Sequence, residues 1–136
     1  MPNRWLVKTE PTTYSFDDLA RERRTTWDGV RNALAQQHLR AMRKGDEVLV
    51  YHSGRDKAVI GLARVTRAPF PDPAAGDSAM VAVDLAAGHR LKQPVSLAAI
   101  RADPAFAGFA LVRISRLSVM PVSAAEWKHL LALGAG

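Results

Sequence analysis

An α+β fold built around one curved sheet or small barrel is the fold class that this sequence predicts. Five or six short apolar runs have the length and the bounding residues of strands, and short helical patterns separate them. The chain has 136 residues, the size of one ordinary domain with its own core. Because the sequence contains no internal repeat and no low-complexity stretch, we expect a single domain over residues 1–136.

The chain begins with a predicted strand and a short helix. The strand starts with the apolar residues 5–7 and continues through residues 8–10, where Pro11 ends it because proline has no backbone N–H. Ser15 is then a good N-cap for a short helix that we expect to end near Arg23. Residues 8–10 lie at a strand end, where loops often carry function.

A longer helix is predicted over residues 32–43. Its apolar stripe consists of Leu34, Ala35, His38, Leu39 and Met42. Its polar face consists of Gln36, Gln37, Arg40 and Arg43. The histidine on the apolar stripe fits a hydrogen-bonded core residue better than a ligand. The basic face either touches a phosphate backbone or is simply solvated.

The middle of the chain predicts a β-hairpin. Residues 47–54 and 59–66 are two strand-like runs, and the polar residues 55–57 join them. Gly61 lies inside the second run, and a glycine within a strand often marks a bulge or a close backbone approach.

After the hairpin we expect a loop at 68–77, a strand at 80–85 and an edge strand at 89–95, where Pro94 interrupts the hydrogen-bond ladder. A short helix is predicted at 97–102.

The C-terminal part is predicted to contain a loop, a last strand and a helix. The loop covers residues 104–108, and residues 111–114 have the pattern of the strand. Ser123 and Glu126 form a capping box that starts the final helix. The expected buried face of this helix consists of Trp127, Leu130 and Leu131.

The chain is strongly basic. Nineteen lysines and arginines stand against thirteen acidic residues, which gives a formal net charge of +6, and fourteen of the nineteen are arginines. Guanidinium groups bind phosphates through paired hydrogen bonds and also stack on bases. Such a charge is typical of nucleic-acid binders, although a compositional bias toward arginine and alanine would produce the same count.

Several classes of site are excluded or disfavoured. The sequence has no cysteine, so disulfides and thiolate zinc sites are excluded, and its four histidines lack metal-ligand spacing. We therefore expect no metal and no cofactor. The longest apolar runs, such as residues 48–51, are too short to span a bilayer, and no signal-peptide pattern is present. We expect a cytoplasmic protein with no membrane association.

Residues 27–32, Trp-Asp-Gly-Val-Arg-Asn, concentrate recognition chemistry. A flat ring can stack on Trp27 while polar groups read its edge, and such groups cannot be buried without partners. The alternative is a surface turn that caps the following helix, with Trp27 as an ordinary core residue, because Asp-Gly is a common turn former. Spacing alone leaves both interpretations open.

No motif supports catalysis. The sequence lacks glycine-rich phosphate loops, the G-x-S-x-G elbow and any cysteine nucleophile. His52 and Ser53 are adjacent in a predicted strand, so their side chains point to opposite faces and cannot act as base and nucleophile together.

A binding pocket remains the best interpretation. Trp27 and Tyr51 are the aromatic candidates. The polar candidates are Lys8, Thr9, Asp28, Arg31, Asn32, His52 and Ser53. Stacking on a base contributes about 1–3 kcal/mol whatever the base, so discrimination must come from hydrogen bonds to its edge, from Asp28, Asn32 or exposed backbone. A base held in this way must be unpaired or flipped out of a duplex.

Four blocks of the sequence resemble the EVE domain family in order and spacing. They are residues 5–11 (Trp-Leu-Val-Lys-Thr-Glu-Pro), 27–32, 51–53 (Tyr-His-Ser) and 117–122 (Leu-Ser-Val-Met-Pro-Val). The similarity runs over essentially all 136 residues. It implies a PUA-like fold, a small mixed β-barrel of about five or six strands with flanking short helices, related to the YTH, ASCH and PUA domains.

The resemblance also implies a pocket for a modified nucleobase, either a modified cytosine in DNA or a modified base in RNA, and no agreed enzymatic activity. By analogy with the aromatic cage of YTH readers, Trp27 would form one wall and Lys8 with Thr9 the floor. Arg31 would serve a phosphate or brace Asp28. The ligand-binding residues implied in this way are Lys8, Thr9, Glu10, Trp27, Asp28, Gly29, Val30, Arg31, Asn32, Tyr51, His52, Ser53, Ser118 and Met120.

The sequence departs from the family pattern in two places. The loop at 68–79 is shorter than usual, which affects any partner contact made there, and Gly54 stands where the family often has asparagine.

Three functions follow as hypotheses. The first is a non-catalytic reader of a modified base, and it is the one we favour. The second is an enzyme acting on a modified nucleotide or small ligand in the same pocket, with Lys8, Glu10, Asp28 or His52 as acid or base. The third is a module that binds nucleic acid through charge alone.

Overall fold

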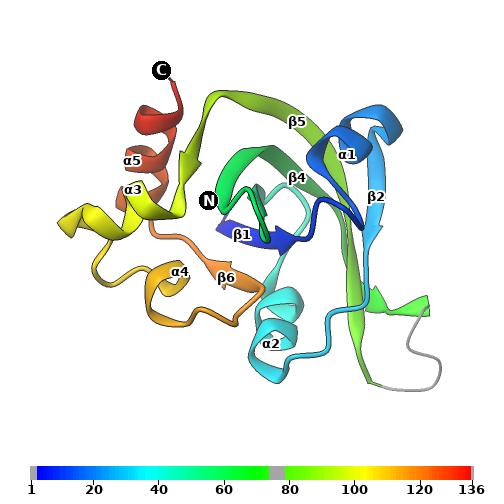
Figure 1. Cartoon of the computed structure of the whole chain (residues 1–136). Coiled ribbons are helices and arrows are strands. Elements are labelled where there is room, and N and C mark those ends of the chain that lie inside the picture. The colour runs from blue at the N-terminus through cyan, green and yellow to red at the C-terminus, as the bar shows by residue number, and fades with distance from the viewer. Residues whose placement is uncertain (1–2, 74–78, 136) are drawn as a thin grey trace.

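The computed structural model describes residues 3–73 and 79–135 (Figure 1). The strands are β1 (Arg4–Thr9), β2 (Arg24–Trp27), β3 (Glu47–His52), β4 (Ala58–Pro71), β5 (Val81–Ser96) and β6 (Val119–Pro121). The helices are α1 (Phe16–Glu22), α2 (Ala33–Ala41), α3 (Leu97–Ala102), α4 (Ala110–Arg113) and α5 (Ala124–Gly134), with a 3₁₀ turn at Pro104–Phe106.

One mixed sheet of six strands organises the fold, in the order β2-β5-β4-β3-β1-β6. β1 and β3 are parallel, and the other neighbours are antiparallel. This confirms the predicted α+β class. Among the described residues no pairing joins the edge strands β2 and β6, so closure of the sheet into a barrel stays a prediction.

The two longest strands give the sheet its curvature (Figure 1). β4 and β5 pair along their length with four register shifts, and such irregularities bend and twist a strand. Two of the shifts flank Gly61. A Cβ atom at Gly61 would lie 2.6 Å from the Phe16 ring, so this glycine lets α1 pack against β4. The expected irregularity at Gly61 is confirmed, and the group that comes close to it is the side chain of Phe16.

The structure differs from the predicted elements in several places. The loop expected at 68–77 begins later, because residues 68–71 extend β4. The two strands at 80–85 and 89–95 are one continuous strand, β5. Pro94 is tolerated there because β2 pairs only with residues 83–86, which leaves one side of β5 without a strand neighbour near Pro94. Residues 111–114 do not form a strand, because 110–113 make the turn α4, and a run of four residues with three apolar ones does not distinguish the two. The mostly polar edge strand β2 was not anticipated.

Helix starts match the predictions closely. Ser15 and Ser123 each accept a backbone N–H in full capping boxes, with Asp18 and Glu126 as the reciprocal partners. Ser96 caps α3 through the N–H of Ala99. Among the described residues no helix is long and apolar enough to cross a membrane.

The carboxylate of Asp46 fixes the N-terminal strand to the end of α2. Asp46 is 2% exposed. Its Oδ1 accepts the backbone N–H of Asn3 at 3.0 Å, and its Oδ2 accepts Trp5 Nε1–H at 2.9 Å and the backbone N–H of Arg43 at 2.9 Å. One buried side chain therefore satisfies three donors from two separate segments.

The side-chain amide of Gln36 fixes α2 to β5 and to the segment before the helix. Its Nε2 donates to the carbonyl of Val30 at 2.7 Å and to that of Val81 at 3.1 Å, and its Oε1 accepts the N–H of Val81 at 2.9 Å. Gln36 is buried and Leu34 is 36% exposed, so their predicted positions on the helix are reversed. α2 is rotated to bring this amide inward.

Replacing Gln36 with methionine, which has a similar volume, should destabilise the protein by about 1–3 kcal/mol, because Val30 and Val81 lose their buried partner. Urea unfolding followed by circular dichroism measures this. Gln37→Met is the matched control, because Gln37 is exposed on the same helix. Equal midpoints for the two variants would contradict the assignment.

Replacing Asp46 with alanine should cost about 3 kcal/mol in the free energy of unfolding, because three donors lose a charged acceptor. Asp17→Ala serves as the comparison, since it removes an exposed ion pair with Arg90 and should cost less than about 1 kcal/mol. The role assigned to Asp46 is wrong if both variants unfold at the same urea concentration.

Candidate functional site

Two cavities adjoin at Lys8, at the C-terminal end of β1. The first, which we call the Trp27 cavity, has a volume of about 430 Å³. Its lining residues are Lys8, Thr9, Thr13, Tyr14, Thr25, Thr26, Trp27 and Asp28. The second, the Arg101 cavity, has a volume of about 530 Å³. Its lining residues are Lys8, Tyr51, Ser53, Gly54, Asp56, Lys57, Ser96, Leu97, Ala98, Arg101, Leu111 and Ser115.

The turn between β1 and α1 builds one side of the Trp27 cavity. The hydroxyl of Thr9 donates to the carbonyl of Tyr14 at 2.7 Å, and the carbonyl of Glu10 accepts the N–H groups of Thr13 and Tyr14. The carboxylate of Glu10 accepts the N–H and the hydroxyl of Thr12. These bonds hold the turn closed, so Tyr14 faces the end of β2.

Trp27 and Tyr14 form an aromatic corner. Their ring centroids are 6.1 Å apart and the ring planes meet at 82°. Trp27 is 8% exposed, so most of the indole is packed in the core while it lines the cavity. The hydroxyl of Tyr14 donates to Glu22 at 2.5 Å, and burial, followed by this hydrogen bond, raises the pKa of Tyr14 above its ordinary value. The tyrosine therefore stays neutral at physiological pH.

The backbone that follows Trp27 is held by buried side chains from other elements. Gly29 has a φ of +73°, a conformation that suits glycine, and its N–H donates to Asp72 at 2.9 Å. The Val30 carbonyl is bound by Gln36. The side-chain oxygen of Asn32 caps α2 by accepting the N–H of Ala35. The turn and the helix cap of the alternative interpretation are therefore both present, and the same segment also borders the Trp27 cavity.

Arg31 and Asp28 have different surroundings from those expected. Arg31 contacts Asp72 at 3.4 Å, so it braces that buried carboxylate and not Asp28. Asp28 is exposed, and within residues 3–73 and 79–135 its carboxylate makes no hydrogen bond or ion pair. The Trp27 cavity thus contains a carboxylate that can accept hydrogen bonds from a ligand.

Lys8 separates the two cavities. Its Nζ donates to the carbonyl of Ser115 at 2.8 Å and lies 5.6 Å from the centroid of the Tyr51 ring. Burial lowers the pKa of Lys8, and the positive charge of Arg101 lowers it further. The backbone N–H of Lys8 donates to the carbonyl of Ser118. Burial also raises the pKa of Tyr51.

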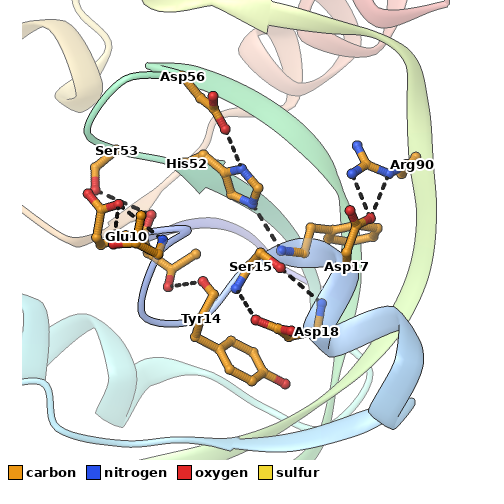
Figure 2. A network of polar contacts seen from close by, with 12 residues as sticks. Glu10, Tyr14, Ser15, Asp17, Asp18, His52, Ser53, Asp56 and Arg90 are labelled. Carbon is orange, nitrogen blue, oxygen red and sulfur yellow. Dashed lines mark hydrogen bonds and ion pairs between the residues drawn. The ribbon is translucent and has the colours of Figure 1, made fainter.

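His52 is a structural residue at the base of α1. Figure 2 shows its imidazole between Asp56 and the first turn of that helix. Its Nε2 accepts the N–H of Phe16 at 2.9 Å, so the proton is on Nδ1, which donates to Asp56 at 2.9 Å. Both ring nitrogens are occupied, and His52 lines neither cavity.

Seven more of the expected binding residues lie outside both linings: Glu10, Gly29, Val30, Arg31, Asn32, Ser118 and Met120. Met120 is wrong as a pocket residue, because it is fully buried in β6 opposite Leu6. Glu10 holds its own turn, and its carboxylate lies 2.4 Å from where a Cβ on Gly54 would be. Gly54 has a φ of +71°, a conformation in which asparagine is one of the few enriched residues besides glycine.

Several lining residues were not predicted from the sequence. Tyr14, Thr13, Thr25 and Thr26 reach the Trp27 cavity, and Arg101 reaches the other. Tyr14 carried no signal, since it stands before a helix N-cap where an apolar residue commonly packs on the helix. The described residues contain no group of three metal-ligating side chains. Of the shortened loop at 68–79, residues 68–71 belong to β4, and residues 74–78 lie outside the described residues.

Known proteins share this fold over nearly the whole chain. Rpa0253 from Rhodopseudomonas palustris is 43% identical, with a TM-score of 0.92 over 97% of this chain and 92% of that one. Human THYN1 protein, solved in complex with DNA containing 5-methylcytosine, is 26% identical, with a TM-score of 0.92 over 98% of each chain. An ASCH protein from Zymomonas mobilis, 12% identical with a TM-score of 0.61, shares the fold alone.

Comparison of sequences gives the same family. Human thymocyte nuclear protein 1 is 37% identical over 84 residues, which are 53% of this chain and 37% of that protein. The match therefore spans little more than a third of this relative. The EVE domain model matches residues 3–133. This chain belongs to the EVE domain family.

Proposed function

We propose that this protein binds a modified nucleobase, unpaired or flipped, in the Trp27 cavity and does so without catalysing a reaction. The observation that carries the proposal is the pairing of an aromatic corner, Trp27 with Tyr14, and an unpartnered carboxylate, Asp28, in one cavity. The complex of human THYN1 protein with 5-methylcytosine DNA makes this base the first ligand to test. A modified base in RNA is the other member of the same class.

Stacking and hydrogen bonding divide the recognition between them. An aromatic wall contributes about 1–3 kcal/mol per base and does not distinguish one base from another. A carboxylate accepts hydrogen bonds from an exocyclic amino group, as on cytosine N4, and repels a carbonyl at the same place, as on thymine O4. Asp28 therefore favours amino-bearing bases. A fully buried methyl group adds about 0.8 kcal/mol, or roughly fourfold in affinity.

The hydrogen bonds of the other acid-base candidates support a non-catalytic role. His52 has both ring nitrogens occupied, and the carboxylate of Glu10 is bound within its own turn. Lys8 donates to a backbone carbonyl. Of the four residues weighed for acid-base chemistry, Asp28 alone is exposed and unpartnered among the described residues.

The cytoplasmic location expected from the sequence stays a prediction.

Replacing Asp28 with asparagine should weaken binding of a single-stranded DNA carrying one 5-methylcytosine by about tenfold or more, because a charged hydrogen bond to the amino group is lost. The same change should also reduce the difference in affinity between the cytosine and the thymine oligonucleotides. Fluorescence anisotropy with matched oligonucleotides (5-methylcytosine, cytosine, thymine) measures both effects. Asp17→Asn, an exposed carboxylate outside the Trp27 cavity, is the charge-matched control.

Trp27→Ala is less suitable as a first test, since the buried indole would leave a void that costs about 3–5 kcal/mol. Trp27→Phe keeps an aromatic wall and should retain part of the affinity if the variant is folded by circular dichroism. The proposal fails if wild type binds all three oligonucleotides equally. It also fails if Asp28→Asn behaves like Asp17→Asn. Affinity that depends on salt but on neither Asp28 nor the base would instead support binding by charge alone.

A further inference from the structure

We propose that the Arg101 cavity binds a phosphodiester of the nucleic-acid strand, next to the nucleotide whose base occupies the Trp27 cavity. The position of this phosphate rests on the proposed function, because the two cavities share Lys8 as a common wall. The site combines cations from three separate elements, Lys8 on β1, Lys57 after β3 and Arg101 on α3.

The charge balance of this cavity favours an anion. Asp56 is the only acid among its described lining residues, and its carboxylate is already bound to His52 at 2.9 Å. Within the described part of the chain, the side chains of Lys57 and Arg101 make no hydrogen bond or ion pair. Two cations therefore face the cavity with no intramolecular partner, beside a half-buried third.

The hydroxyl groups in the cavity add donors that suit phosphate oxygens. Ser96 accepts the N–H of Ala99 as the cap of α3, which leaves its own O–H free to donate. Ser115 also lines the cavity, and so does Ser53, whose hydroxyl already donates to the carbonyl of Thr9 at 3.3 Å. The remaining wall is apolar, from Tyr51, Leu97 and Leu111. Phosphate contacts position a strand without reading its sequence, whereas the Trp27 cavity faces the base.

The charge of Arg101 can be tested by the dependence of binding on salt. Arg101→Gln should weaken the binding of 5-methylcytosine and cytosine oligonucleotides by the same factor. It should also reduce the slope of log affinity against log salt by about 1. Lys57→Gln should repeat this result. Arg101 and Lys57 are exposed, so neither change threatens folding. Arg64→Gln is the control, since Arg64 pairs in register with Glu47, at the other end of β3 from Tyr51.

A second arm identifies the source of the phosphate. Single phosphates of the oligonucleotide are replaced in turn by neutral methylphosphonates. One replacement beside the modified base should weaken binding to the wild-type protein and should not further weaken binding to the Arg101→Gln variant. If no position shows this coupling while inorganic phosphate alone shifts the Arg101-cavity amides in NMR spectra, the cavity holds a free anion and the strand assignment is wrong.

The two proposals fail separately. The affinity ratio between 5-methylcytosine and cytosine reports the Trp27 cavity, and the salt slope reports the Arg101 cavity. A ratio of one with a slope that still depends on Arg101 overturns the proposed function and keeps the phosphate site. The phosphate site is overturned if Arg101→Gln changes the slope of log affinity against log salt no more than Arg64→Gln does. A changed ratio in Arg101→Gln also overturns it, because a phosphate contact is blind to the base.

Discussion

The Trp27 cavity depends on two buried polar side chains that hold the backbone after Trp27. Gln36 binds the carbonyl of Val30 and both backbone polar groups of Val81, and Asp72 accepts the N–H of Gly29. Without these bonds, the five-residue loop 28–32 between β2 and α2 would have many conformations, and ordering it on ligand binding would cost about 1–2 kcal/mol per residue in entropy. In the folded protein these bonds already order the loop before a ligand binds. Asp28 is therefore presented from a fixed backbone.

The same constraint shows which parts of the fold could be predicted from the sequence. Helix starts were predictable, because a serine cap with an acidic partner three residues later satisfies local hydrogen bonds wherever the helix packs. Gly61 was informative for a similar reason, since a glycine inside a strand commonly marks a bulge or a close backbone approach. The run at 111–114 and the strand β2 depend on their neighbours in space, and their short patterns fit strand and helix alike.

For the candidate site, residues that the sequence indicated on β1, β2 and β3 do line the two cavities, but the role of each residue was not evident from the sequence. Trp27, Asp28, Lys8 and Thr9 do line the Trp27 cavity. Histidine is a common binding-site residue, but His52 instead accepts the N–H of Phe16 at the start of α1, at 2.9 Å. This contact joins two segments that are distant in the sequence, so the sequence does not indicate it. Tyr14 and Arg101 reach the cavities through tertiary packing, which no spacing along the chain encodes. Gln36 illustrates the same limit, since helical periodicity placed it on the solvated face.

Tryptophan indoles give the most direct test of the central claim, that Trp27 forms the wall against which a modified base stacks. The chain has three tryptophans, and the other two are internal controls: Trp5 Nε1–H is bound to Asp46, and Trp127 is 4% exposed on α5. The measurement is an NMR titration of the indole N–H signals with a DNA strand carrying one 5-methylcytosine. We expect the Trp27 signal to shift while the signals of Trp5 and Trp127 stay in place. A saturating titration that leaves the Trp27 signal unmoved would contradict the claim.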